Sequence, residues 1–293
     1  MRILVIGGTG FIGKHIVRRL ADAGHSVALY HRGRTAAKLP EQVHEILDPL
    51  SAMPIVKFPK ELFEFNPDAV VHTVAMGSKD ASAAVQAFAG KTGRLIMLSS
   101  GDVYRAYGRF IGIEPGPIEE GLLTEESPLR TVLFPYRSQA ESPAAIEYWY
   151  EKILAEQSVL ANKDLPATVL RLPKVYGPGS NEDLGTVYRY RQHPNWRWTH
   201  GYVENVAAAV ELAATCPTAT GRVYNVGEEH TPTVAERLAW MPPSAIEPDP
   251  ASDSKNFAQN IAYDTSRIRR ELGYREIVPE REAVLKTLQS KAR

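Results

Sequence analysis

The stretch Gly7-Gly8-Thr9-Gly10-Phe11-Ile12-Gly13 follows the apolar run 3–6 and opens a segment with helical spacing. A continuous apolar run is typical of a buried parallel strand. Gly7 permits a tight exit from this strand, Gly10 lets backbone approach a pyrophosphate, and Gly13 lets the helix pack closely on the strand. The N–H groups of the first helical turn have no partner inside the helix, so they face the anion. The stretch predicts a phosphate-binding turn, with an ordinary structural turn as the alternative.

The pattern after this turn indicates a doubly wound sheet. Ile12, Ile16, Val17 and Leu20 lie on one helix face, and Gly24 is suited to end that helix. Strand-like runs then alternate with helical or loop segments at 27–31, 69–73, 95–99, 167–172 and 223–226. This alternation predicts an α/β fold, a parallel Rossmann-type sheet with helices on both faces.

Prolines and glycines interrupt the pattern after Leu172. We therefore expect a dinucleotide-binding domain over 1–172 and a smaller, interleaved C-terminal substrate lobe over 173–293, with 203–227 returning to the sheet. Residues 179–197 indicate a loop-rich cap and 242–256 an exposed loop. Asp264 or Thr265 is suited to cap a short helix that runs through Leu272 and ends at Gly273.

The composition limits the classes of function. The 293 residues include 34 Lys and Arg and 34 Asp and Glu, so the formal net charge is zero and favours a small ligand over nucleic acid or a membrane surface. Cys216 is the single cysteine, which excludes an internal disulfide and a cysteine-rich metal site. No metal is expected, and a reducing cytoplasm fits. The N-terminal apolar run is too short for a secretory signal, and no segment approaches the length of a membrane span.

Two arginines follow the second expected strand, Arg32 and Arg34, where a dinucleotide site that prefers NAD carries a carboxylate. A guanidinium pairs well with the 2′-phosphate of NADP, so this end of the strand favours NADP over NAD. A solvated basic loop is the alternative. Asp48 is a candidate adenine contact or a solvated surface group.

Ser99 and Ser100 end a further expected strand. Ligands of open α/β sheets bind outside the carboxyl ends of the strands, so both hydroxyls are expected to face the cofactor cleft. Small hydroxyl residues are also common turn formers, which is the alternative interpretation.

Tyr148 and Lys152 are four residues apart in a segment, 148–156, with helical patterning. On a continuous helix they share a face, where the ammonium lowers the pKa of the phenol from its usual value of about 10. Such a tyrosine exchanges a proton with a substrate hydroxyl or carbonyl, and Ser100 would polarise the same oxygen. The spacing predicts Ser100, Tyr148 and Lys152 as catalytic residues, against an aromatic edge beside a solvated lysine.

These motifs, in this order, resemble the extended and atypical short-chain dehydrogenases/reductases, the NAD-dependent epimerase/dehydratase family. Further segments carry the resemblance across nearly the whole chain: 170–179, 201–207, 223–227 and 264–268. The resemblance implies a doubly wound sheet, a smaller C-terminal lobe that closes over the substrate, and NAD or NADP as cofactor. It implies substrates that are sugar nucleotides or other hydroxyl- and carbonyl-bearing compounds.

The resemblance also assigns roles. It implies that the turn 7–13 holds the pyrophosphate, that Tyr148 and Lys152 form the family's Tyr-x-x-x-Lys pair, and that Lys152 also bonds the nicotinamide ribose. It implies further that Ala75 lines the adenosine and nicotinamide path, with Pro173 and Val175 at the nicotinamide pocket. Many relatives pair through helices near the Tyr/Lys position, which leaves a homodimer open.

Three departures from the family pattern leave alternatives. Atypical members often keep the tyrosine two residues before the lysine, where this chain has Tyr150, yet on a regular helix Tyr150 points roughly 200° away from Lys152. Tyr148 is therefore preferred. The long stretch 105–147, with Arg105, Tyr107, Arg109 and Tyr136, forms either a lid or a surface excursion. Arg197 either binds a substrate diphosphate or packs between Trp196 and Trp198.

The leading hypothesis is an NADP-dependent oxidoreductase of the epimerase/dehydratase type. It transfers hydride between nicotinamide and a hydroxyl or carbonyl carbon of a sugar nucleotide or another small substrate. One alternative is a non-catalytic NADP-binding sensor or partner-binding protein. RNA binding is a third interpretation, opposed by the zero net charge but open through a local patch of Arg189, Arg191 and Arg197.

Overall fold

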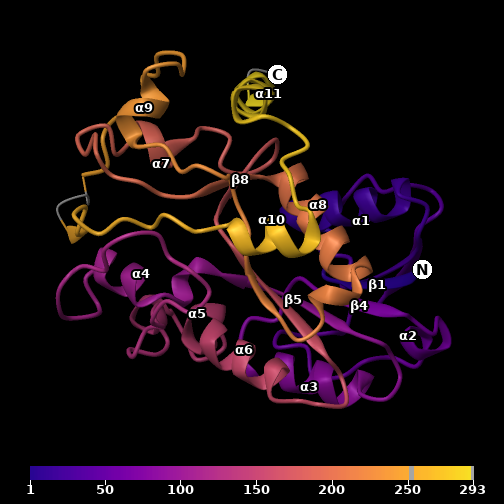
Figure 1. Ribbon diagram of the computed structural model, residues 1–293. Coiled ribbons are helices and arrows are strands. Elements are labelled where there is room, and N and C mark those ends of the chain that lie inside the picture. Colours follow the sequence, from indigo (N-terminus) through magenta and orange to yellow (C-terminus); the bar gives the residue numbers. More distant parts are fainter. Residues whose placement is uncertain (251–253, 292–293) are drawn as a thin grey trace.

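A seven-stranded parallel sheet forms the centre of the computed structural model, which describes residues 1–250 and 254–291 (Figure 1). Every neighbouring pair of its strands is parallel. In order across the sheet, the strands are β3 (His44–Leu47), β2 (Ser26–His31), β1 (Arg2–Ile6), β4 (Ala69–His72), β5 (Leu95–Ser100), β6 (Ala167–Leu172) and β9 (Val223–Asn225). The predicted α/β doubly wound parallel sheet is confirmed.

The two faces of the sheet bury two separate apolar clusters. Side chains of β1 alternate between them: Ile3 and Val5 enter one cluster, and Leu4 and Ile6 enter the other. The first is covered by α1 (Phe11–Asp22), α8 (Val203–Thr215) and α10 (Ser266–Leu272), and the second by α3 (Ser78–Phe88), α6 (Lys152–Leu160) and the short α2 (Glu61–Glu64) (Figure 1).

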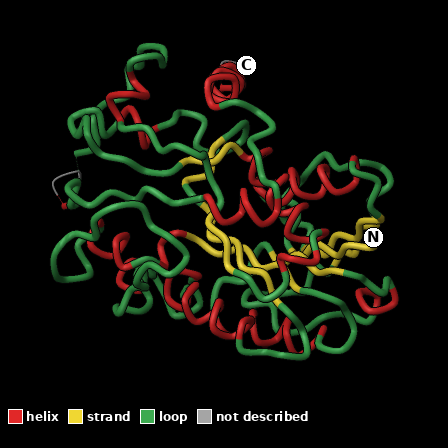
Figure 2. Tube along the Cα trace, viewed as in Figure 1, coloured by secondary structure: helices red, strands yellow, loops and turns green. Residues whose placement is uncertain are grey.

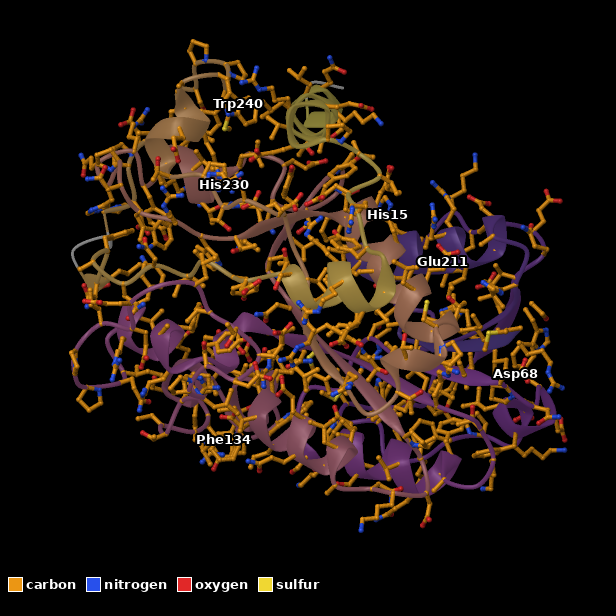
Figure 3. The ribbon with its side chains drawn as sticks, in the orientation of Figure 1. His15, Asp68, Phe134, Glu211, His230 and Trp240 are labelled. Atoms are coloured by element: carbon orange, nitrogen blue, oxygen red, sulfur yellow. The ribbon has the colours of Figure 1, made fainter. Side chains whose placement is uncertain are left out.

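Helix α1 fixes the glycine turn to the sheet. Ile16, Val17 and Leu20 are fully buried, as the helical spacing predicts, and Gly24 follows the helix with a φ of +80°. An ion pair from Arg19 to Glu211 joins α1 to α8 on the face where Figure 3 labels Glu211. Apolar burial and the contact with α8 thus fix the position of α1 on the sheet.

All six strands expected from the sequence are present in the central sheet, and β3 is an addition to it. This strand has four residues, and among them only Ile46 is buried. A single buried position gives no alternating pattern, so β3 follows from its pairing with β2 and not from its own periodicity.

The C-terminal part is mostly loop around a small second sheet (Figure 2). Strands β7 (Lys174–Tyr176) and β8 (His200–Tyr202) pair in parallel, surrounded by α7 (Gly185–Tyr188), α9 (Val234–Leu238) and α11 (Glu280–Lys291). The predicted short helix is α10, which ends at Gly273 with a φ of +69°. Of the loop expected over 242–256, residues 251–253 lie outside the described residues.

The stretch 101–151 crosses the open end of β5 with little regular structure. It contains α4 (Arg105–Phe110), α5 (Ile146–Trp149) and two short 3-10 turns, Gly101–Val103 and Arg137–Gln139. A third 3-10 turn, Pro217–Ala219, lies outside this stretch and follows α8.

Within the described ranges, no helix is long and apolar enough to cross a membrane.

Candidate functional site

The glycine turn adopts the geometry that a dinucleotide phosphate needs. Gly7 has a φ of +87°, a backbone conformation that favours glycine. A Cβ on Gly13 would lie 2.6 Å from the Cα of Gly8, so the close approach of α1 to the turn requires glycine. A Cβ on Gly10 would meet nothing within 4 Å, and α1 has no acidic residue in its first turn. The N-terminus of α1 is therefore open and favourable to an anion.

Two cavities meet at this turn. One, of about 260 Å³, extends over the end of β2 and is lined by Thr9, Tyr30, Arg32, Arg34 and Ile55 together with Gly7 and Gly10. The other, of about 400 Å³, extends over β5 and includes Gly7 and Gly10 with Phe11, Ile12, Gly13, Ser99, Ser100, Tyr150, Lys152, Pro173 and Val175. Together they form an elongated cleft with the glycine turn at its centre, a shape that suits a dinucleotide.

The cavity over β2 is basic at the strand end. Arg32 and Arg34 both line it, and neither has a side-chain hydrogen bond or ion pair within the described part of the chain. Asp48 does not line this cavity, because its carboxylate accepts a hydrogen bond of 2.9 Å from the Tyr30 hydroxyl. Asp48, the expected adenine contact, thus holds Tyr30, and it is Tyr30 that lines the cavity.

Lys152 is buried at the second cavity, and two backbone carbonyls hold its ammonium group. Its ammonium donates to the carbonyl oxygens of Ala75 at 2.6 Å and Leu98 at 2.9 Å. An ammonium has three donors, so one is left for a ligand in the cavity that Lys152 lines. Burial lowers the pKa of Lys152 to about 8, while the charge of Asp102 raises it.

The predicted pairing of Tyr148 with Lys152 on one helix face is wrong. Tyr148 belongs to α5, which ends at Trp149, whereas Lys152 is the first residue of α6. Tyr148 is 38% exposed and lies against the guanidinium of Arg137, outside both cavities. The chain break between the helices moves it away from the lysine.

Polar contacts explain why the helix breaks at this point. The Glu151 N–H donates to the carbonyl of Met76 and not to a helical neighbour, and the Glu151 carboxylate caps α6 by accepting from the N–H of Ile153. Arg130 forms an ion pair of 3.0 Å with Glu151, and both side chains are fully buried. The carbonyl of Trp149 would lie 3.0 Å from a Cβ on Gly77, so this glycine admits the passing chain.

The break places Tyr150 in the cavity with Ser100 and Lys152. The Tyr150 hydroxyl donates to Oδ2 of Asp102 at 2.8 Å, and the Lys152 ammonium lies 5.8 Å from the centre of the Tyr150 ring. Burial and the charge of Asp102 raise the pKa of Tyr150 well above its usual value, and a hydrogen bond with Ser100 lowers it. The tyrosine two residues before the lysine is the one that the structure brings to the cleft.

The remaining predicted residues divide between lining and support. Pro173 and Val175 line the cavity over β5, whereas Ala75 is fully buried and contributes its carbonyl to Lys152. Ser99 lines the cavity and also donates to the buried Glu156 at 2.5 Å. Gly8 is buried, and it is packed so closely that a Cβ there would lie 2.4 Å from a methyl of Leu29.

The long stretch 105–147 contributes to the site from its two tyrosines. Tyr136 donates to Oδ2 of Asp102 at 3.0 Å, and its hydroxyl lies within hydrogen-bond distance of the Tyr107 hydroxyl at 3.3 Å. Arg105 and Arg109 instead pair with Glu119. Asp102 is the group that sequence reasoning missed, although it follows Ser100 by only two residues. The sequence feature that could have indicated Asp102 is a carboxylate just after the carboxyl end of a strand, where ligands of such sheets bind.

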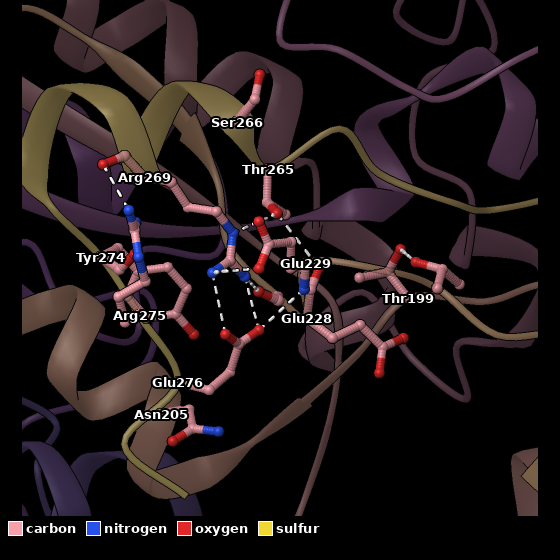
Figure 4. Close-up of polar contacts among 12 residues, drawn as sticks. Thr199, Asn205, Glu228, Glu229, Thr265, Ser266, Arg269, Tyr274, Arg275 and Glu276 are labelled. Atoms are coloured by element: carbon pink, nitrogen blue, oxygen red, sulfur yellow. Dashed lines mark hydrogen bonds and ion pairs between the residues drawn. The ribbon is translucent and has the colours of Figure 1, made fainter. Parts of the chain in front are cut away.

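A separate cavity of about 350 Å³ lies in the C-terminal part, lined by Tyr176, His200, Tyr202, Asn205, Glu228, Glu229, His230, Tyr274, Glu276 and Glu280. Its acids have internal partners. Arg269 donates to both carboxylate oxygens of Glu276 at 3.0 and 2.6 Å (Figure 4), and Arg237 pairs with Glu228 and Glu280. Burial raises the pKa of Glu228 to about 7. This network fixes the C-terminal segment and shares no lining residue with the cleft.

The arginines of the expected basic patch have internal partners as well. Arg189 pairs with Asp183, Arg191 donates to the carbonyl of Ile246, and Arg197 donates to the carbonyl of Thr231. Arg197 thus binds backbone, while the Trp196 indole N–H donates to the carbonyl of Gln259. No group of three or more potential metal ligands is found in residues 1–250 and 254–291.

Residues 3–91 match the model of the NAD dependent epimerase/dehydratase family. The 2'-dehydrokanamycin reductase of Streptomyces kanamyceticus is 28% identical over 186 residues, which are 62% of this chain and 45% of that protein. The match therefore spans less than half of this curated relative.

Three solved structures share the fold over their lengths. Pal from Bacillus thuringiensis superposes with a TM-score of 0.72 at 18% identity, over 100% of this chain and 99% of that chain. WbmG of Bordetella bronchiseptica in complex with NAD gives 0.71 at 17% identity, over 100% and 94%. The UDP-glucose 4-epimerase of Thermotoga maritima with UDP-glucose gives 0.69 at 18% identity, over 100% and 99%.

Proposed function

We propose that this chain is a nicotinamide-dependent oxidoreductase of the NAD dependent epimerase/dehydratase family, whose model residues 3–91 match, and that it acts on a hydroxyl or carbonyl carbon. The observation that carries the proposal is the meeting of Ser100, Tyr150 and Lys152 in the cavity that begins at the glycine turn. A nicotinamide cofactor in that cavity would supply the hydride chemistry.

We propose NADP as the cofactor. The support is the pair Arg32 and Arg34 beside the glycine turn, with no carboxylate among the lining residues of that cavity. A guanidinium binds phosphate through paired, charge-assisted hydrogen bonds. The open N-terminus of α1 would hold the pyrophosphate, and the free donor of Lys152 would bond a ribose hydroxyl.

In this proposal Tyr150 takes the acid/base role first expected of Tyr148. Its hydroxyl is buried at the cavity and stays a phenol, because the pKa of Tyr150 is raised. A neutral phenol donates a proton to a carbonyl oxygen or exchanges one with a hydroxyl. Ser100, which hydrogen-bonds Tyr150, would orient that oxygen.

The proposed substrate is a sugar nucleotide or a related small carbonyl compound. Structures with this fold include an epimerase solved with UDP-glucose and MoeE5 solved with UDP-glucuronic acid and NAD, and the curated relative is named a reductase. The proposed substrate lobe is 173–293, with 203–227 contributing to the dinucleotide-binding part over 1–172. A reducing cytoplasm is proposed from the single cysteine, Cys216.

Cofactor binding and turnover test the proposal in two steps. NADPH and NADH are titrated into the protein by cofactor fluorescence, and a panel of UDP- and dTDP-sugars and their keto forms is then screened for cofactor oxidation or reduction. We expect NADPH to bind more tightly than NADH and at least one substrate to exchange hydride. Tight NADPH binding without exchange across the panel would support the non-catalytic sensor instead. Equal affinity for the two cofactors would contradict the NADP assignment.

A further inference from the structure

Asp102 is a buried carboxyl group directly behind the Tyr150 hydroxyl. It is 5% exposed, and its Oδ2 accepts from the hydroxyls of Tyr150 at 2.8 Å and Tyr136 at 3.0 Å. Its Oδ1 is buried and has no hydrogen-bond partner within the described residues. One oxygen of the carboxyl group is thus committed to two phenols, and the other retains its full capacity to accept.

Asp102 has no ion-pair partner in the described part of the chain. Arg130 donates through Nε to the backbone carbonyl of Asp102, not to its carboxylate, and its other nitrogens are used by Glu151 and the carbonyl of Val132. The charged and titratable groups that face Asp102 from neighbouring elements are Tyr107, Arg130, Tyr136, Tyr150, Lys152 and Tyr263. A buried carboxylate without a direct cation is costly to keep charged, so it accepts a proton readily.

Lys152 is not placed to make Tyr150 a tyrosinate. Its ammonium donates to the carbonyls of Ala75 and Leu98 and lies 5.8 Å from the Tyr150 ring centre. A carboxylate that accepts the phenolic hydrogen bond favours the neutral phenol. The immediate partner of the tyrosine hydroxyl is therefore an acid, not the lysine.

We propose that Asp102 is a positioning residue that holds the proton of the reaction by acting through Tyr150. This inference rests on the proposed function. When a substrate hydroxyl is oxidised, its proton moves to the Tyr150 oxygen while the phenolic proton of Tyr150 moves to Oδ2 of Asp102. The electron pair of the broken carbon–hydrogen bond leaves as hydride to the nicotinamide class of acceptor. In carbonyl reduction the protonated Asp102 returns its proton to Tyr150 as Tyr150 protonates the new alkoxide oxygen.

The pKa values of Asp102 and Tyr150 are both raised, and the hydrogen bond between them shifts the two values in opposite directions. Burial raises the pKa of Asp102, while the hydrogen bond from Tyr150 and the charge of Arg130 lower it. Burial first, and then the charge of Asp102, raise the pKa of Tyr150. Asp102 is thus the group that receives the proton in this pair, and Tyr150 passes the proton between Asp102 and the substrate oxygen.

Tyrosine and aspartate NMR titrations test the proposal without any substrate. Protein carrying ¹³Cζ-tyrosine or ¹³Cγ-aspartate is titrated with pH in the wild type, Asp102→Asn, Tyr150→Phe and, as a matched control, Tyr148→Phe. We expect the Tyr150 signal of the wild type to stay that of a phenol beyond the usual tyrosine pKa of about 10, and to titrate at a lower pH in Asp102→Asn. An unchanged Tyr150 titration in Asp102→Asn overturns the proposal.

The aspartate label keeps the test decisive if Asp102→Asn does not fold. Since the Tyr150 hydroxyl stabilises the charged carboxylate, Tyr150→Phe should raise the pKa of the Asp102 signal, and Tyr148→Phe should leave it in place. An Asp102 signal that is the same in the wild type and Tyr150→Phe overturns the proposal.

Turnover then separates this inference from the proposed function. Asp102 does not line the cofactor cavities, so Asp102→Asn should keep its NADPH affinity. On any accepted substrate, it should lower kcat about 10²-fold, leave KM in place and lose the pH dependence of kcat. A pH profile of kcat identical to that of the wild type overturns the inference. Failure of every substrate contradicts the proposed function alone, because the two titrations do not depend on turnover.

Discussion

Residues 1–100 and residues 101–151 line the same cleft but are held in different ways. The first region consists of strands β1–β5 and their helices, and its side chains divide between two apolar clusters. The second has two short helices and is fixed by polar contacts, including Arg130 with Glu151 and Glu114 with the N–H groups of Thr131 and Val132. Local periodicity positions the cofactor turn, whereas contacts between distant residues position the tyrosine.

The largest expected effect contrasts Tyr148 and Tyr150, both of which lie in residues 101–151. Tyr150→Phe should lower turnover about 10²- to 10⁴-fold, because a positioned acid/base group contributes that much. Tyr148→Phe should change turnover less than about twofold, since Tyr148 lies outside both cavities. Steady-state kinetics on one accepted substrate checks both. A larger loss in Tyr148→Phe than in Tyr150→Phe would restore the original assignment.

The second prediction concerns stability in the same region. Arg130→Ala leaves Glu151 charged and fully buried, so we expect a loss of about 3–5 kcal/mol in the free energy of unfolding. Lys60→Ala breaks an exposed pair, 80% and 62% exposed, and should leave the free energy of unfolding nearly unchanged. Urea denaturation measures both. Similar losses in the two variants would show that the region does not depend on its buried ion pair.

The fold of residues 1–100, called the regular region below, was predictable because its sequence pattern is local. The run 3–6, the turn 7–13 and the helix ending before Gly24 each follow from spacing and from glycine geometry, and the structure has all three. Strand β3 was not predictable, because only Ile46 is buried in it and its position comes from pairing with β2.

The residues that meet over β5 were predictable only in part. Ser100 and Lys152 reach the cleft as expected, because a strand end and a helix start place them. A regular helix over 148–156 would point Tyr150 away from Lys152, but the chain breaks between α5 and α6. The break depends on Met76, Gly77 and Arg130, which are far from it in the sequence, so no periodicity around residue 150 reveals it.

A third prediction uses pH to test the regular region. His72 on β4 is fully buried, neither ring nitrogen has a partner among the described residues, and burial lowers its pKa to about 3. The unfolded chain binds a proton at His72 below about pH 6.5 and the folded protein does not, so stability falls with decreasing pH. The contribution of His72 to this loss should be about 2 kcal/mol between pH 7.5 and 5.

The variant His72→Leu isolates this contribution. Urea denaturation at both pH values should show a loss smaller than that of the wild type by about that 2 kcal/mol, while other buried histidines such as His200 affect both proteins equally. Identical pH dependence in the two proteins would show that His72 gains a partner in solution.

The smallest expected effect tests the cofactor end of the regular region. Arg32→Ala and Arg34→Ala should each weaken NADPH binding about 10-fold and leave NADH binding nearly unchanged, because only NADPH carries the 2′-phosphate that a guanidinium would bind. Arg270→Ala, a matched change at a side chain that is 67% exposed, should alter neither affinity. Fluorescence titration with both cofactors measures the ratio. Equal losses for NADPH and NADH would mean that the arginines act on the pyrophosphate or the adenine, and the cofactor preference would then have to come from another part of the cleft.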